Sequence, residues 1–293
     1  MTRVKKKAKF KIKVARQVGY CYGVQRAIDL ALSAANGSRP EPIYTLGPII
    51  HNPQVVESLN RQAIRTASSL DEVKKGTVII RSHGVDPKIT QLAKKRGISI
   101  LDATCPFVKK AQKKSAELAG EGYFVVILGE RNHPEVLSIM AYAGPNSIVV
   151  EGAEDVEAIP KKAQRIGIVV QTTQSVEKLD ELVSLLLERV AELKVHNTTC
   201  SATTRRQEEA RLLTDTVDVM LVVGGKNSAN TTRLAEMCRD KGTPTYHIET
   251  AQEIQKDWFK DGDIVGVTTG TSTSQWILKE VIDYLEKMAD EVV

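Results

Sequence analysis

Residues 18–26 read VGYCYGVQR, residues 102–110 read DATCPFVKK, and residues 197–205 read NTTCSATTR. In each stretch a cysteine follows a segment of extended character and precedes a helical one. Pro106 suits the first position of a helix, and the Thr and Asn residues just before two of the cysteines are capping residues. The three cysteines lie 84 and 95 residues apart, so we interpret the chain as three copies of one structural unit.

Two further features recur in the same order after each cysteine. A β-like run that closes on glycine lies at residues 43–47, 125–129 and 221–224, and a polar side chain follows four residues after each glycine: His51, His133 and Ser228. A second β-like run, preceded by a short acidic turn or helix, lies at 77–80, 166–170 and 263–267. Strands that alternate with helices predict parallel sheets, which bind ligands at the carboxyl ends of their strands.

The fold predicted from this recurrence is α/β, with three similar small domains whose sheets are mainly parallel. The predicted domains are residues 23–104, 105–199 and 200–293, joined by an N-terminal strand over 10–22. A pseudo-threefold axis through these domains would bring the polar strand ends together.

Composition is that of an ordinary globular chain. Of its 293 residues 42% are hydrophobic and 26% charged, and mean hydropathy is −0.20. The longest apolar runs are far shorter than the ~20 residues that span a bilayer, so we expect no membrane association. Much of the net charge of +5 comes from a basic cluster over residues 3–11, but aromatic residues are only 4%, so we do not expect nucleic-acid binding. No secretory signal is recognisable, and we expect a cytoplasmic protein.

The four cysteines are too few and too widely spaced for a disulfide framework, and none forms a C-x-x-C pair. Cys21, Cys105 and Cys200 each precede a predicted helix, whose dipole favours the thiolate and therefore metal ligation or nucleophilicity. Three thiolates without a fourth fit a zinc site with one open position or an iron–sulfur cluster with one iron lacking a protein ligand. The residues alone do not separate these two. Cys238 is interpreted as a buried hydrophobic residue.

The other recurring residues predict an anion site. Their side chains are neutral or cationic donors suited to phosphate oxygens, and helix N-termini following them would add backbone N–H groups. The predicted members are His51, His83, His133, Thr172, Ser228, Asn230 and Ser272. Glu135 falls in the first turn of a helix, where it is either stabilised by the helix dipole for structural reasons or able to supply protons to a leaving oxygen.

Several motifs resemble those of the 4-hydroxy-3-methylbut-2-enyl diphosphate reductase family, also called IspH or LytB. The resemblance covers nearly the whole chain. Its motifs are GYCYGV at 19–24, TLGPIIHNP at 45–53, RSHGV at 81–85, DATCP at 102–106, HPEV at 133–136, QTT at 171–173, NTTC at 197–200 and KNS at 226–228.

The resemblance implies a trefoil of three α/β domains around a central [4Fe–4S] cluster, one per chain, held by Cys21, Cys105 and Cys200. It implies that the fourth iron binds the allylic hydroxyl of the substrate and that two electrons and two protons remove this hydroxyl as water. The products would be isopentenyl and dimethylallyl diphosphates, the end of the non-mevalonate pathway of isoprene biosynthesis. A carrier such as ferredoxin or flavodoxin would supply the electrons.

The family also implies roles for the polar residues of the site. Glu135, with Thr172 and His133, would relay protons. The diphosphate would be held by His51, His83, Ser228, Asn230 and Ser272.

This sequence departs from the usual family pattern at several positions near the expected site, among them residues 201, 229 and 275. Ala229 replaces a serine, Ser201 replaces an aspartate, and Gln275 stands where an acid is usual. We expect the first change to remove one hydroxyl from the diphosphate site. Two other functions stay open from the sequence: a non-redox hydratase or lyase that uses the open iron as a Lewis acid, and a cluster-bearing sensor that binds a diphosphate.

Overall fold

The computed structural model describes residues 9–290 and contains three four-stranded sheets, all parallel. Of the basic N-terminal cluster, Arg3, Lys5, Lys6 and Lys7 lie outside the described residues. The chain forms two compact units. The smaller unit contains the described residues up to Cys21, His51–Pro53, and those from Ala202 onward, and the larger unit contains Tyr22–Ile50 and Gln54–Ser201.

The larger unit holds two of the sheets. One has the strand order β3-β2-β4-β5 and the other the order β7-β6-β8-β9. The elements of the first are α1 (Tyr22–Asn36), β2 (Ile43–Leu46), α2 (Pro53–Asn60), β3 (Ile64–Ala67), the 3-10 turn η1 (Leu70–Glu72), β4 (Thr77–Ile80), α3 (Pro87–Lys95) and β5 (Ser99–Asp102). Those of the second are α4 (Pro106–Gly120), β6 (Phe124–Leu128), α5 (Pro134–Ala143), β7 (Ser147–Val150), η2 (Ala153–Ala158), β8 (Arg165–Val170), α6 (Val176–Leu187) and β9 (Glu192–His196).

The smaller unit holds the third sheet, with strand order β1-β12-β10-β11. Its elements are β1 (Lys11–Val14), α7 (Ser201–Thr214), β10 (Val219–Val223), α8 (Ala229–Asp240), β11 (Thr245–Ile248), η3 (Ala251–Glu253), η4 (Lys256–Trp258), β12 (Ile264–Thr269) and α9 (Gln275–Asp290). The N-terminal strand β1 pairs with β12 and takes the sheet position that β5 and β9 occupy in the other two sheets. The predicted α/β class, the parallel sheets and the threefold repetition of elements are therefore confirmed.

The strand expected over residues 10–22 is shorter than predicted and spans only Lys11–Val14. The backbone N–H groups of Arg16 and Gln17 donate to the two carboxylate oxygens of Glu209, at 2.5 and 2.6 Å, so they are not available to a sheet ladder. Gly19 then takes a φ of 81°, in the left-handed region that favours glycine, and turns the chain toward Cys21.

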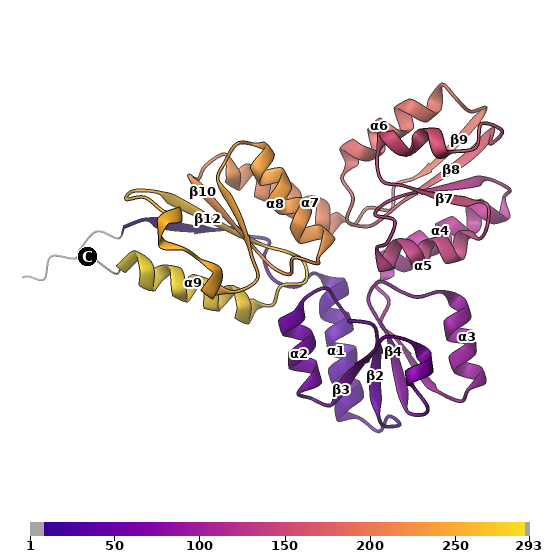
Figure 1. Ribbon diagram of the computed structural model, residues 1–293, viewed down its shortest axis with the longest axis horizontal. Helices are drawn as coiled ribbons and strands as arrows, with labels where there is room; N and C mark the ends of the chain where they lie inside the picture. Colours follow the sequence, from indigo (N-terminus) through magenta and orange to yellow (C-terminus); the bar gives the residue numbers. More distant parts are fainter. Residues whose placement is uncertain (1–8, 291–293) are drawn as a thin grey trace, which may run out of the picture. The chain divides into compact units, whose positions relative to one another are not determined.

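Each sheet is buried between helices, as Figure 1 shows for α6 on one side of the β6–β9 sheet and α4 and α5 on the other. Strand β6 is apolar at every position because both of its faces are covered. Val126 and Leu128 pack with Leu182 of α6 on one face, and Val125 and Ile127 pack with α4 and α5 on the other. The two cores fix the direction of the strand, and with it the position of the loop that follows Leu128.

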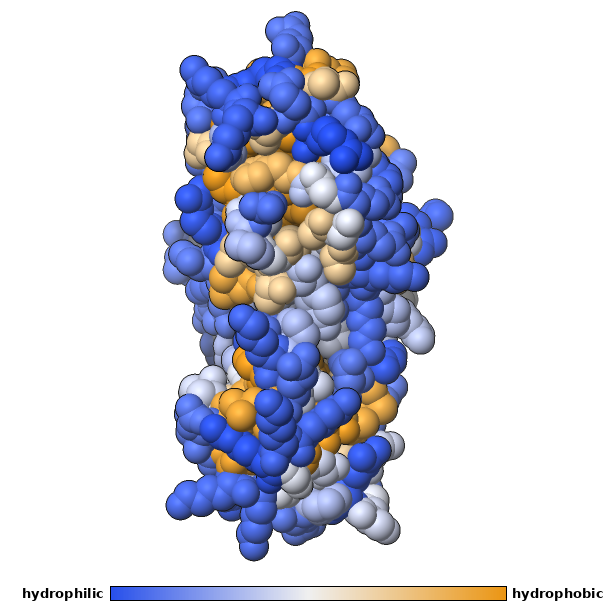
Figure 2. Space-filling view, turned by 90° about the vertical axis from the view of Figure 1, so that its right-hand side faces the viewer, coloured by the Kyte–Doolittle hydropathy of each residue, from blue (hydrophilic) through white to orange (hydrophobic). Residues whose placement is uncertain are grey.

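The surface of Figure 2 is mostly hydrophilic, with hydrophobic residues in smaller orange areas. In the larger unit the exposed large hydrophobic residues are Tyr22, Leu92, Leu137, Tyr142, Leu185, Leu187 and Val195. Of the helices within residues 9–290, none combines the length and the hydropathy that crossing a membrane requires.

Cys238 is fully buried in the core of the smaller unit, beside Leu234 and Ala235. Its sulfur lies 3.3 Å from Thr214 Oγ1 in a hydrogen bond, and burial raises the pKa of this thiol, with the Thr214 bond opposing the shift. Thr214 Oγ1 also donates to the carbonyl of Ala210 at 2.6 Å, so removing the sulfur does not leave this hydroxyl unsatisfied.

We therefore expect Cys238→Ala to lower the free energy of unfolding by about 1 kcal/mol through lost burial and a small cavity. Urea denaturation of the apo-protein measures this change. Iron bound after anaerobic reconstitution should stay at the wild-type level, and a loss of iron in this variant would make Cys238 a ligand instead of a core residue.

Candidate active site

The cysteines of the repeated motif share one backbone contact. The N–H of Cys105 donates to the carbonyl of Ser82 at 2.9 Å, and the N–H of Cys200 donates to the carbonyl of Thr172 at 2.9 Å. In the smaller unit the N–H of Cys21 donates to the carbonyl of Thr271 at 3.1 Å. The acceptors lie in the loops after β4, β8 and β12, so each cysteine is fixed at the carboxyl end of a parallel strand by the same kind of bond.

Cys105 is the N-cap residue of α4, with Pro106 at the first helical position as expected. Its side chain makes no capping hydrogen bond, so the thiol is not used to satisfy the helix terminus. Cys21 and Cys105 are partly exposed and Cys200 is 8% exposed, and none of the four cysteines forms a disulfide. The motif cysteines are therefore not held in disulfides, and the Cys105 thiol does not cap its helix.

Glu135 is 2% exposed and lies in the first turn of α5. One carboxylate oxygen, Oε1, accepts the N–H of Thr172 at 2.6 Å, and the other, Oε2, accepts the hydroxyl of Thr172 at 2.9 Å. His133 caps the same helix, because its Nδ1 accepts the N–H of Glu135 at 3.1 Å. The carboxylate is thus held by two donors from the end of β8, and His133 carries its ring proton, when neutral, on Nε2.

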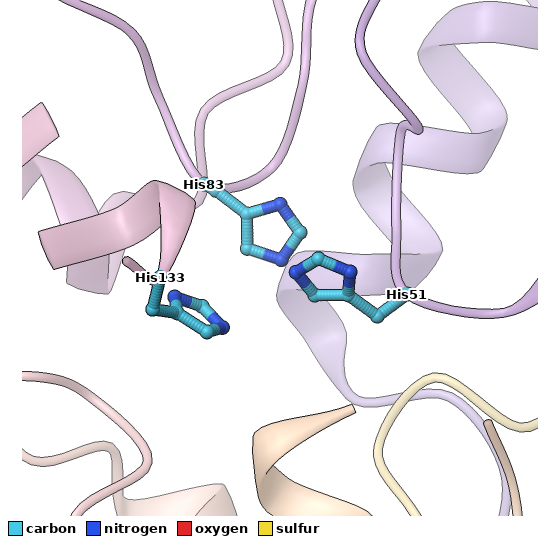
Figure 3. Close-up of side chains that lie close together, drawn as sticks. All are labelled: His51, His83 and His133. Atoms are coloured by element: carbon cyan, nitrogen blue, oxygen red, sulfur yellow. The ribbon is translucent and has the colours of Figure 1, made fainter. Parts of the chain in front are cut away.

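His83 and His133 lie side by side in the larger unit (Figure 3). Their ring centroids are 5.5 Å apart and the rings meet edge to face at 85°. The hydroxyl of Ser138 lies 2.8 Å from the carbonyl of His83 and 2.8 Å from that of Glu135, so it links the loop that carries His83 to the first turn of α5. The side-chain amide of Gln112 donates to Ser138 at 3.1 Å. This buried network fixes the loop after β4 to helix α5.

Gly84 makes that network possible. Its φ is 74°, and a Cβ at this position would lie 2.3 Å from Nε2 of Gln112. Only glycine both adopts this conformation readily and leaves room for the amide.

His51, Ser228, Asn230 and Ser272 belong to the smaller unit. The hydroxyl of Ser272 donates to the carbonyl of His51 at 3.1 Å, and a Cβ on Gly225 would lie 2.7 Å from the same carbonyl, so these loops approach closely. Ser228 caps α8 by accepting the N–H of Thr231 at 3.5 Å. Asn230 is 2% exposed, and neither atom of its side-chain amide has a hydrogen-bond partner within the described residues. A buried amide of this kind is typical of a site that awaits a ligand.

The predicted site residues thus fall into two groups. Cys105, Cys200, His83, His133, Glu135 and Thr172 belong to the larger unit, and Cys21, His51, Ser228, Asn230 and Ser272 belong to the smaller one.

Two residues near the cysteines were not among the predicted site residues. Gly23 lies in α1, where a Cβ would lie 2.5 Å from the sulfur of Cys105. Arg206 lies in α7 and is 4% exposed. The signal for Arg206 was available in the sequence, because a charged residue stands six positions after Cys200 where the other two repeats have Ala27 and Ala111. The contact of Gly23 with Cys105 had no such signal.

Residues 12–286 match the family model described as LytB protein. The chain belongs to the LytB protein family. Relatives named 4-hydroxy-3-methylbut-2-enyl diphosphate reductase include one from Citrifermentans bemidjiense, 49% identical over 272 residues, which cover 92% of this chain and 95% of the relative. Another, from Geobacter sulfurreducens, is 46% identical and the match covers 94% of this chain and 97% of that one.

Solved structures agree with this LytB assignment. One, described as (E)-4-hydroxy-3-methyl-but-2-enyl diphosphate reductase, the terminal enzyme of the non-mevalonate pathway, is 44% identical with a TM-score of 0.71, covering 94% of this chain and 99% of its own. The E-1-hydroxy-2-methyl-but-2-enyl-4-diphosphate reductase of Plasmodium falciparum is 26% identical with a TM-score of 0.87, covering 96% and 88%. The predicted family, and with it the oxidoreductase class, is confirmed.

Proposed function

We propose that this LytB protein reduces (E)-4-hydroxy-3-methylbut-2-enyl diphosphate to isopentenyl and dimethylallyl diphosphates. In this reaction the allylic C–O bond breaks, two electrons and one proton convert the carbon skeleton to product, and a second proton leaves with the hydroxyl oxygen as water. The observation that carries the proposal is the buried Glu135 carboxylate, held by both donors of Thr172 in a chain of this family.

The proposal includes a [4Fe–4S] cluster bound by Cys21, Cys105 and Cys200, within a trefoil of three domains at 23–104, 105–199 and 200–293. The residues fit such a group: the N–H of each of the three cysteines donates to a carbonyl in the loop after a strand, and the missing Cβ of Gly23 makes room for the sulfur of Cys105. When bound, the cluster would supply electrons and one Lewis-acidic iron without a protein ligand.

The protein residues would bind the diphosphate and move protons. His51, His83, Ser228, Asn230 and Ser272 are proposed to donate hydrogen bonds to phosphate oxygens, which the buried amide of Asn230 supports. Glu135 is proposed to deliver the proton to the leaving oxygen, with the Thr172 hydroxyl orienting the carboxylate and His133 completing the relay. Burial of Glu135 excludes bulk water from this step.

The electrons are proposed to come from an external carrier such as ferredoxin or flavodoxin. A cytoplasmic location is part of the proposal, because cysteines that form no disulfide are typical of a reducing compartment.

The deciding experiment is anaerobic turnover of the allylic diphosphate by the reconstituted protein with an artificial one-electron donor. We expect both C5 diphosphates as products, identified by mass spectrometry, and no product when the donor is omitted. Conversion without a donor would indicate a hydratase or lyase instead, and binding without product in the presence of a strong reductant would indicate a sensor.

The departure at Ala229 leads to a prediction about affinity. Ala229 is the first residue of α8 and is 9% exposed. A hydroxyl here would add a hydrogen bond to a charged phosphate, worth about 1.5–3 kcal/mol, and 1.4 kcal/mol corresponds to a factor of about ten in binding. We therefore expect Ala229→Ser to lower the KM for the diphosphate substrate about tenfold with little change in kcat. Steady-state kinetics measure this, with the exposed Ala191→Ser as control. An unchanged KM in Ala229→Ser would remove position 229 from the diphosphate site.

A further inference from the structure

Arg206 is a buried cation whose role the proposed reaction leaves unexplained. Its side chain is 4% exposed, and within the described residues none of its hydrogen-bond acceptors is a carboxylate. Burying a charge without a hydrogen-bonded counter-ion costs free energy, so other interactions of Arg206 must compensate for this cost. The pKa of Arg206 is lowered by burial, and electrostatic attraction to Cys21 and Glu209 opposes this shift only in part. The guanidinium stays charged, since arginine does not deprotonate in proteins.

The guanidinium joins two segments that are far apart in sequence. Nη1 donates to the carbonyl and hydroxyl of Thr269 and to the carbonyl of Gly270, at 2.8, 2.9 and 2.8 Å. Nη2 donates to the carbonyl of Gly19 at 2.9 Å. Arg206 therefore connects the end of β12 to the turn that leads into Cys21.

The same turn is held by two more bonds. The N–H of Gly19 donates to Thr269 Oγ1 at 2.9 Å, and the N–H of Cys21 donates to the carbonyl of Thr271 at 3.1 Å. Thr269 Oγ1 thus accepts hydrogen bonds from both Arg206 and Gly19. Loss of the guanidinium removes the first of these bonds and leaves only the second.

Comparison of the repeats shows that two of the three units of this kind are built with alanine at the equivalent position. Helices α1, α4 and α7 all begin directly after a motif cysteine, and six residues after that cysteine stand Ala27, Ala111 and Arg206. Both alanines are fully buried. The repeat of Cys105 has Ala111 at this position, and the N–H of Cys105 nevertheless donates to the carbonyl of Ser82 in the loop after β4.

We propose that Arg206 is a positioning residue for Cys21, which clamps the turn over Gly19–Cys21 to β12 and holds a fixed positive charge at the carbonyl of Gly19, two residues before Cys21. The part of this inference that concerns the charge rests on the proposed cluster. A thiolate-bound cluster carries negative charge that grows on reduction, and a nearby fixed cation favours the reduced state.

The first test uses the apo-protein and does not depend on the cluster. Hydrogen–deuterium exchange is measured for wild type, Arg206→Met and Arg206→Lys, with the exposed neighbour variant Arg205→Met as control. We expect the amides of Gly19 and Cys21 to exchange at least about tenfold faster in both Arg206 variants, because neither side chain reproduces the planar fork of four hydrogen bonds. Amides of β10 and the whole Arg205→Met protein should match wild type.

Unchanged exchange at Gly19 and Cys21 overturns the proposal, and so does an equal increase throughout β10, which would show a general stabilising role. If Arg206→Met does not fold, Arg206→Lys decides the same question.

The second test uses protein reconstituted with iron and sulfide. We expect the midpoint potential of Arg206→Met to be about 59 mV lower than that of wild type. For one electron this corresponds to about a tenfold change in the reduction equilibrium. Arg206→Lys, which keeps the charge, should restore most of the potential. An unshifted potential in Arg206→Met overturns the charge role. If wild-type protein holds no cluster, the proposed function fails while the exchange result on the turn still stands.

Discussion

Glu135→Gln should reduce turnover of the allylic diphosphate by about 10²–10⁴-fold while the protein keeps its fold and its iron content. This range is the usual contribution of a positioned general acid or base. Glutamine has nearly the same shape as glutamate but has no proton of suitable acidity to give to a leaving oxygen.

The contacts of Glu135 explain why the fold should tolerate this change. The amide oxygen of glutamine can still accept the N–H of Thr172, which lies 2.6 Å from Oε1 in the wild type. The hydroxyl of Thr172, 2.9 Å from Oε2, can rotate and accept a hydrogen bond from the new NH₂ group. The hydroxyl proton of Thr172 and the second N–H of the new amide then lose or lack this acceptor, so we expect the free energy of unfolding to fall by about 1–3 kcal/mol.

A matched control separates the proton role of Glu135 from its position at a helix N-terminus. Glu177 is the acidic residue in the first turn of α6, and it is exposed. Glu177→Gln removes the same charge from an equivalent helix position, where the dipole contributes about 0.3–1 kcal/mol. We expect wild-type turnover from this variant. The variants are compared by initial rates at saturating substrate and donor, with iron content determined on the same samples. A wild-type rate in Glu135→Gln would show that Glu135 is not the proton donor.

The repeated elements were predictable because each depends on local sequence. An apolar run such as Val125–Leu128 indicates a strand covered on both faces, and the glycine after it marks the turn. Pro106 and His133, which begin or cap helices, likewise act within a few residues of their own position. The three copies reinforced one another, since a pattern that is weak once becomes strong when it recurs in the same order.

The contacts between distant segments were not predictable in this way. The link from Gln112 through Ser138 to the carbonyl of His83 joins three segments whose approach is decided by the packing of α4 against α5. The shortening of the first strand depends on Glu209, almost two hundred residues away in the chain. A single sequence contains the residues of these contacts but not the distances between them.

Gly23→Ala should remove most of the bound iron from reconstituted protein while leaving the apo-protein folded. Gly23 is the second residue of α1, and a Cβ there would lie 2.5 Å from the sulfur of Cys105 and 3.2 Å from its Cβ. Ordinary contact between such atoms is about 3.5–4.0 Å, so the thiol would have to move by about 1 Å or more.

The relevant magnitudes separate the effect on iron from the effect on folding. Overpacking costs about 1–3 kcal/mol, but alanine favours a helix over glycine by about 0.8–1.0 kcal/mol, so the net loss of stability is small. A metal–ligand distance, by contrast, tolerates only about 0.2 Å. A displacement of about 1 Å therefore removes Cys105 from an iron site long before it unfolds the protein.

Iron and acid-labile sulfide per chain, measured after anaerobic reconstitution, test this prediction together with thermal unfolding of the apo-protein. Gly120→Ala is the matched control, because Gly120 ends helix α4 and a Cβ there would have no atom within 4 Å. We expect full iron in Gly120→Ala and a several-fold loss in Gly23→Ala. Wild-type iron in Gly23→Ala would mean that the Cys105 side chain can rotate away from the new methyl group and still bind, so that the close approach of α1 to Cys105 is a matter of packing and not of the cluster.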